Sequence, residues 1–148
     1  MTARFDIGGF DELEKMLKEL GPEIGTKAGQ IATRKAGQFV AKKVRAAAPV
    51  GDGDTSRTYT TAAGPVTVDY GHLKRNIKVQ KKRKNRRKTV GTIIGTGNAF
   101  WGRFLEFGTR KMAARPWFGP AMKSASGEAL NVMKTELRKA ITKLGRGR

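Results

Sequence analysis

A stripe of small apolar side chains along one segment constrains the fold of this chain more than any other feature. Between about Glu23 and Ala47, apolar residues recur at helical spacing and basic residues cover much of the other side. Alanine is frequent in the stripe, so another helix or a sheet can approach closely. Ala48-Pro49 ends the segment, because the residue before a proline disfavours helical geometry. The stripe consists of Ile24, Ala28, Ile31, Ala32, Phe39, Val40 and Val44.

Two further helices are predicted, one on each side of the chain's centre. Asp11 and Glu14 have the spacing of a capping box, and Gly21-Pro22 stops the helix that they begin. A short strand, "RFDIGG", is expected before it. The last helix should run from near Gly119-Pro120 to about Leu144. Its apolar face comprises Met122, Ala125, Ala129, Val132, Met133, Leu137, Ala140, Ile141 and Leu144.

The middle of the chain is predicted to hold a loop and a β-hairpin. Residues 51–70 are rich in Gly, Asp, Ser, Thr and Pro without a period, which indicates an exposed loop insertion. Alternating apolar residues from Leu73 to Val79, and again from Val90 to Ile94, predict two strands with a basic tip at about 80–88. The expected fold is therefore one α+β domain over residues 1–148. A small antiparallel sheet with a long charged β-hairpin packs there against two or three helices.

Charge is distributed unevenly along the chain. The formal net charge is +19, yet residues 1–23 carry six acids against three bases, and residues 24–148 carry 28 bases against six acids. Such a field favours polyanions or acidic protein surfaces as neighbours. The chain has no cysteine, and neither a signal peptide nor a membrane-spanning segment is recognisable. A soluble protein made in a cytoplasm is expected.

The basic tract is a candidate contact surface for DNA or for an acidic protein. Ten of the fifteen residues from Lys74 to Lys88 are Lys or Arg, and none is acidic. No aromatic lies between Gly71 and Ala99, so a stacking platform for single strands is missing. Any contact with DNA would be to the backbone and non-specific. A hairpin that is simply solvated, or one that docks on an acidic protein surface, is equally compatible with the tract. The candidate contact residues are Lys81, Lys82, Arg83, Lys84, Arg86, Arg87 and Lys88.

Catalysis, metals and cofactors are not expected. His72 is the only histidine, so a histidine-based catalytic relay or metal cluster cannot be built within one chain. Asp52 and Asp54 lie in the predicted loop, and the remainder of a calcium loop is missing. "GTIIGTG" lacks the Gly-Lys-Ser/Thr end of a phosphate-binding loop.

Six of the eleven aromatic residues gather in the stretch "FWGRFLEFGTRKMAARPWFGPAM", residues 100–122, around the carboxylate of Glu106. A strand or short helix ending at Phe107 is expected there, followed by a turn at Gly108-Thr109 that glycine permits. A buried unpaired carboxylate would be too costly, so Glu106 should accept backbone or arginine donors, with Arg115 as a candidate. An exposed glutamate on an edge is the alternative.

This stretch resembles the Glu-Phe-Gly-Thr signature, followed by Arg-Pro-Trp-Phe and Pro-Ala, of small neck proteins in long-tailed bacteriophages. These are head–tail joining or tail-completion proteins, akin to the minor tail protein Z group. Three further motifs resemble the family in the same order: "GGFDELEKMLKEL", "RAAAPVG" and "GHLKRNI". Order and spacing fit over roughly residues 5–125. The insertion at 51–70 departs from the family, in which the Ala-Pro and Gly-x-Leu elements stand close together.

The resemblance implies a structural virion protein and not an enzyme. It would be assembled in the host cytoplasm as a ring at the neck, with a hexamer as first choice and a dodecamer as second. Its neighbours would be the head-side connector and the tail tube or terminator, with DNA passing through the channel. The expected assembly and turn residues are Glu106, Phe107, Gly108, Thr109, Arg115, Pro116, Trp117 and Phe118, of which Pro116-Trp117-Phe118 should present aromatic surface to a neighbouring subunit. A basic, non-specific nucleic-acid-binding protein is the alternative function.

Overall fold

The computed structural model describes residues 15, 18–19, 21–51, 53, 55–81 and 90–145, and these form an α+β fold as predicted. The predicted first strand and most of the predicted first helix lie outside the described residues, as does most of the basic hairpin tip. The helices are α2 (Pro22–Ala47), α3 (Leu73–Asn76), α4 (Trp101–Phe107) and α5 (Phe118–Gly145). The strands are β1 (Ser56–Thr61), β2 (Gly64–Asp69), β3 (Lys78–Lys81) and β4 (Thr92–Gly95).

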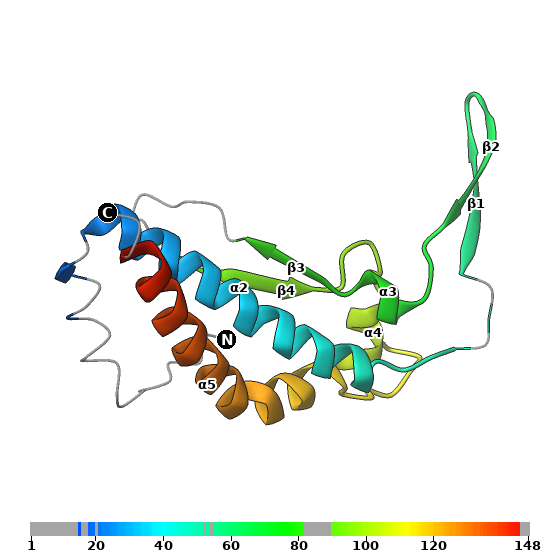
Figure 1. The fold of residues 1–148 in the computed structure, drawn as a ribbon. Coiled ribbons are helices and arrows are strands. Elements are labelled where there is room, and N and C mark those ends of the chain that lie inside the picture. The colour runs from blue at the N-terminus through cyan, green and yellow to red at the C-terminus, as the bar shows by residue number, and fades with distance from the viewer. Residues whose placement is uncertain are drawn as a thin grey trace.

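Two long helices, α2 and α5, form the body of the molecule and run alongside each other in opposite directions (Figure 1). Both helices were predicted within one or two residues of their observed bounds, because each carries an uninterrupted apolar stripe. Alanines line both sides of the contact, so the two backbones approach closely. Ile31 is the exception in the predicted stripe, since it is 43% exposed. The buried residues of the two helices are Ala28, Ala32, Ala36, Gly37, Val40, Ala41, Val44, Ala121, Ala125, Ala129, Leu137, Ala140 and Ile141.

Strands β3 and β4 pair antiparallel and pack against α2, which confirms the predicted pairing. Val79 lies opposite Ile94 in the register, and both side chains pack against the core. Gly37 of α2 makes this contact possible. A Cβ atom at Gly37 would lie only 2.7 Å from Cγ2 of Thr92, so any larger residue would push the helix off the sheet.

The prediction of an irregular loop at 51–70 is wrong. Strands β1 and β2 pair along their full length, from Ser56 opposite Asp69 to Thr61 opposite Gly64. We call this hairpin, residues 56–69, the arm; it projects away from the body on the right of Figure 1. Threonine, tyrosine and valine alternate in it and favour strands, whereas the connecting residues, Ala62 and Ala63, give no hairpin-turn signal.

The predicted strand around Leu73 also needs correction, because residues 73–76 form the single helical turn α3. Leu73 and Ile77 are both buried in the core as expected, but from a helical turn and the residue that follows it. A helix of four residues is too short to show a helical period, so alternation alone suggested a strand.

Candidate functional site around Glu106

The segment that follows α4 folds back on itself in a tight turn. The amide of Gly108 donates to the carbonyl of Phe104 at 2.8 Å and closes the helix. Gly108 has a φ of 74°, and a Cβ there would lie 2.8 Å from two backbone atoms, the nitrogen of Ala114 and the oxygen of Met112. Thr109 and Met112 then bond to each other across the turn. Glycine is therefore needed at position 108 for two reasons: the backbone conformation, as predicted, and the lack of space for a Cβ atom.

Glu106 binds the start of α5, the helix that follows the turn. Its Oε2 accepts hydrogen bonds from the amides of Trp117 and Phe118 at 2.7 and 2.8 Å. Its Oε1 accepts from the amide of Gly119 at 2.8 Å. The first amides of a helix have no partner within the helix, and the helix dipole favours a negative charge beside them. The carboxylate of α4 therefore caps α5 from eleven to thirteen residues upstream in the chain.

The environment of Glu106 keeps its carboxylate ionised. Burial opposes the charge, but the backbone donors of Trp117, Phe118 and Gly119 together outweigh it and hold the pKa of Glu106 below its ordinary value of 4.5. The predicted backbone donors are therefore present. Arg115 acts differently from the prediction: its own amide donates to the carbonyl of Leu105 at 2.7 Å, and its side chain is exposed.

One predicted surface residue is instead part of the core. Trp117 is only 6% exposed and packs with Ala121 and Ala125 of α5. Its indole nitrogen faces the carbonyl of Gly102 at 3.4 Å. Because its side chain is buried, Trp117 offers no aromatic surface to a neighbour. Phe107 is the contrasting residue, because it is 75% exposed.

The sequence did not reveal a set of aromatic contacts that joins α4 to the base of the arm. The ring of Tyr70, just after β2, meets Phe100 and Trp101 edge to face, with centroids 6.1 and 5.7 Å apart. Phe100 also meets Phe104, 5.8 Å away. Tyr70 is separated from this segment by thirty residues of sequence. Aromatic composition alone could not pair them.

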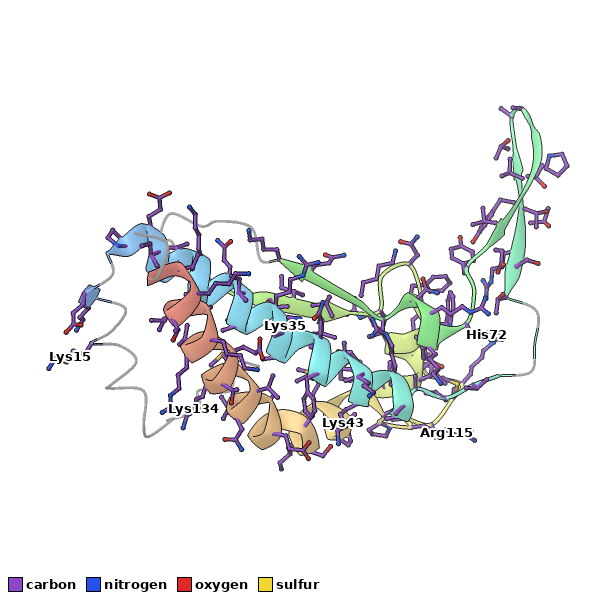
Figure 2. The ribbon with its side chains drawn as sticks, in the orientation of Figure 1. Lys15, Lys35, Lys43, His72, Arg115 and Lys134 are labelled. Carbon is purple, nitrogen blue, oxygen red and sulfur yellow. The ribbon has the colours of Figure 1, made fainter. Side chains whose placement is uncertain are left out.

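Asn76 is the buried polar residue at the base of the arm. It is 8% exposed, and its side-chain amide donates to the carbonyls of Tyr70, Gly71 and His72. In Figure 2, His72 lies at the same end of the molecule as Arg115, and both line a hollow of about 440 Å³ beside the arm. By binding these three carbonyls, the side chain of Asn76 fixes the turn from which the arm leaves the body.

The basic tract is only partly within the described residues. Lys81 ends β3 and is exposed, whereas Lys82, Arg83, Lys84, Arg86, Arg87 and Lys88 lie outside the described part of the chain. Beside Lys81, α2 and the sheet of β3 and β4 border a groove of about 500 Å³. Lys27, Arg34 and Lys81 line it, together with Ile31, Val79 and Leu144.

The described residues provide neither a three-ligand metal cluster nor a helix that could cross a membrane. Within ranges 21–51, 55–81 and 90–145 and the few single residues between and before them, His, Asp and Glu form no group of three that could hold a metal ion. Over the same part of the chain, no helix has the length and apolar character needed to cross a bilayer.

Comparison with known proteins gives one match. The family model described as "Bacteriophage HK97-gp10, putative tail-component" matches residues 11–108, which is about two thirds of the chain. Neither a curated protein nor a solved structure matches. The matched range includes α2, the arm, both strands of the second sheet and α4, and it ends at Gly108 of the turn. The chain belongs to the HK97-gp10-like family of bacteriophage tail components, in agreement with the resemblance to head–tail joining and tail-completion proteins.

Proposed function

We propose that this protein is a non-enzymatic structural component of the phage neck. It forms a closed ring, with six copies as first choice and twelve as second, that joins or completes the tail where it meets the head. Family membership carries the proposal, since the family is one of tail components. Its flanking partners are the head-side connector and the tail tube or terminator, and the genome passes through its channel.

The physical character of the subunit supports an assembled state. A chain of +19 repels itself, and the core contains many alanines and few large side chains. Several large apolar residues stay exposed in the single copy, including Phe107 and Val66. Burial between copies would supply the apolar contacts that one copy lacks, and a closed cyclic interface satisfies every copy equally.

The basic tract of residues 81–88 is assigned to one of two contacts within this ring. It either lines the channel against the DNA backbone or holds an acidic surface on the neighbouring ring. Both uses bring opposite charge to the tract, as its charge density requires. Only the first use gives a dependence on salt that scales with the number of phosphates contacted.

The symmetry of the assembled protein tests the proposal most directly. Electron-microscopy class averages of the purified protein, or of phage necks, should show a ring of sixfold or twelvefold symmetry. The alternative function predicts a monomer that binds double-stranded DNA tightly and loses affinity steeply as salt rises. A DNA-binding monomer that forms no ring alone or with connector or tail proteins would overturn the neck proposal.

Neutralising the basic tract separates its role from the fold. We expect a chain in which Lys81, Lys82, Arg83, Lys84, Arg86, Arg87 and Lys88 are changed to Gln to keep the wild-type thermal unfolding curve. Phage carrying it should show impaired head–tail joining or DNA retention. The matched control changes seven exposed lysines that lie outside both the tract and the groove: Lys35, Lys42, Lys43, Lys111, Lys123, Lys139 and Lys143. Normal yields of infectious particles from the tract variant would remove the tract from the mechanism.

A further inference from the structure

An exposed apolar strip runs from the arm onto α4. Its six residues are between 38% and 75% exposed, although each is a large hydrophobic or aromatic side chain. Contiguous apolar surface of this kind on a soluble protein marks an interaction site. We call it the apolar strip; it consists of Tyr59, Val66, Val68, Phe100, Phe104 and Phe107.

Register and ring contacts make the strip continuous. Tyr59 lies opposite Val66 in the hairpin, and Val68 is two residues further along β2, so the three side chains share one face. The hydroxyl groups of Tyr59 and Tyr70 are 2.7 Å apart, and the ring of Tyr70 meets Phe100. Phe104 and Phe107 follow Phe100 at helical spacing on one side of α4.

The base of the arm is fixed before any partner arrives. Asn76 holds the carbonyls of residues 70–72, and the ring of Tyr70 packs on α4. The guanidinium of Arg57 lies over the ring of Phe100, 5.6 Å from its centroid. An arm whose base is held in this way loses little conformational freedom when it docks, which favours tight association.

Charge indicates what the strip contacts. By sequence, residues 51–71 carry three acids against one base, a net charge of −2 in a chain whose other residues sum to +21. Two bodies of this protein repel each other, whereas the arm itself, residues 56–69, is net neutral because Arg57 and Asp69 cancel, so a cationic body does not repel it. A second copy of this chain therefore offers a cationic and apolar surface that a neutral, aromatic arm can approach without charge repulsion.

The residues of the α2–sheet groove come from the first half of α2, the Lys81 end of β3 and the end of α5. These elements lie away from the arm in Figure 1. The groove between α2 and the sheet has an exposed isoleucine, Ile31, and cationic side chains from Lys27, Arg34 and Lys81. Cations of this kind bind favourably over aromatic faces such as that of Tyr59. Because arm and groove are at different ends, their contact joins copies head to tail, which is the geometry that closes a ring.

We propose that the arm of each copy docks into the α2–sheet groove of the next, with Tyr59, Val66 and Val68 against Ile31. The phenylalanines of α4 extend the same contact. The inference deepens the proposed function and rests on it, because the ring supplies the neighbouring copy. It assigns a task to the insertion at residues 51–70.

Association measured by light scattering at increasing protein concentration tests the contact. Val66→Thr and Val68→Thr keep β-branched residues in the strand, and Phe107→Ser alters a side chain that is already exposed, so the fold is retained. The triple variant should dissociate at concentrations at least about tenfold higher than the wild type. The control, Thr60→Ser with Thr67→Ser, changes the other face of the arm and should associate like the wild type.

Each outcome decides a different question. A ring that persists unchanged in the triple variant would overturn the arm contact and leave the neck function standing. A wild-type chain that stays monomeric alone and with its neck partners would overturn both.

Cysteine cross-linking tests the receiving surface, and the chain has no native cysteine to interfere. A Val66→Cys chain mixed with an Ile31→Cys chain should yield a mixed disulfide dimer under mild oxidation, because a disulfide forms only between closely placed Cβ atoms. Thr67→Cys, on the opposite face of the arm, should cross-link at least about tenfold less. Disulfides confined to the Val66→Cys chain alone would show arm-to-arm pairing and overturn the groove assignment.

Discussion

The turn that follows Glu106 and the arm are two segments outside the pair of long helices. They differ in whether their own chain supplies all of their contacts. In the turn, the amides that start α5 bind Glu106, and the backbone of Arg115 binds that of Leu105. In the arm, the backbone pairs within the hairpin, but the side chains of Val66 and Val68 have little to cover them. The turn is complete within one chain, whereas the arm lacks a partner for its apolar face.

The difference separates stability from assembly in this subunit. Changes in the turn should lower the free energy of unfolding of a single copy. Changes of Val66, Val68 or Phe107 on the apolar strip should leave that free energy almost unaltered and weaken contacts between copies. The free energy of unfolding and the association between copies should be measured for the same variants. The distinction would fail if each variant lowered both.

Gly108→Ala should have the largest effect on the single copy. The added methyl group would meet backbone atoms of Met112 and Ala114 at 2.8 Å, and a φ of 74° is strained for alanine. We expect a loss of about 3 to 4 kcal/mol, measured by chemical denaturation. Gly127→Ala is the matched control, because its Cβ meets nothing within 4 Å. A helix propensity gain of about 0.5 to 1 kcal/mol is expected there.

Glu106→Ala should have the next largest effect. It leaves the amides of Trp117, Phe118 and Gly119 without their charged acceptor, which costs about 2 to 3 kcal/mol by denaturation. Glu106→Gln keeps one carbonyl oxygen and should lose less than the alanine variant. Equal losses in both variants would mean that the charge of Glu106, and not its geometry, supplies the whole contribution.

Acid should weaken the turn in a defined direction. Because the pKa of Glu106 is lower in the folded chain than its ordinary 4.5, the unfolded chain binds more protons at acidic pH. The contribution of Glu106 is therefore fully present above about pH 4.5 and is lost as the pH falls through the folded value. The difference in stability between wild type and Glu106→Gln, followed from pH 6 to pH 3, should shrink. A constant difference would contradict this linkage.

Val66→Thr with Val68→Thr should have the smallest effect on the single copy. Both side chains are more than one third exposed and both replacements favour strands, so the expected change in unfolding free energy is below about 0.5 kcal/mol. Thermal unfolding of dilute protein measures it. A loss of 2 kcal/mol or more would mean that the arm is packed within its own chain, and the contrast with the turn would disappear.

Features set by local periodicity could be predicted from the sequence. The alanine stripes of α2 and α5 gave both helices, and alternation gave the pairing of β3 with β4. The chemistry of Glu106 was also predictable, since a carboxylate among aromatic residues needs donors. Which donors it binds was not, because the amides of residues 117–119 become available only when α5 begins there.

Features set by contacts distant in the sequence could not be predicted. The arm buries no apolar face in its own core, so residues 51–70 carry little of the hydrophobic signal that marks a strand. Trp117 was expected at the surface because tryptophan side chains are favoured anchors at protein interfaces. It lies instead in the core cluster with Ala121 and Ala125, and its indole N–H donates to the carbonyl of Gly102, fifteen residues earlier in the chain. The basic tip beyond Lys81 remains a prediction.

Asn76 and the ring of Tyr70 together set the angle at which the arm leaves the body. A six-residue hairpin is about 20 Å long, so a tilt of about 10° at its base moves its tip by about 3 to 4 Å. In the proposed ring, each copy is rotated from the next by about 60° for six copies and about 30° for twelve. If the arm docks as proposed, the direction in which it leaves the body would set how many copies close the ring. The hydrogen bonds from Asn76 to the carbonyls of residues 70–72 would thus help to determine the number of subunits in the proposed ring.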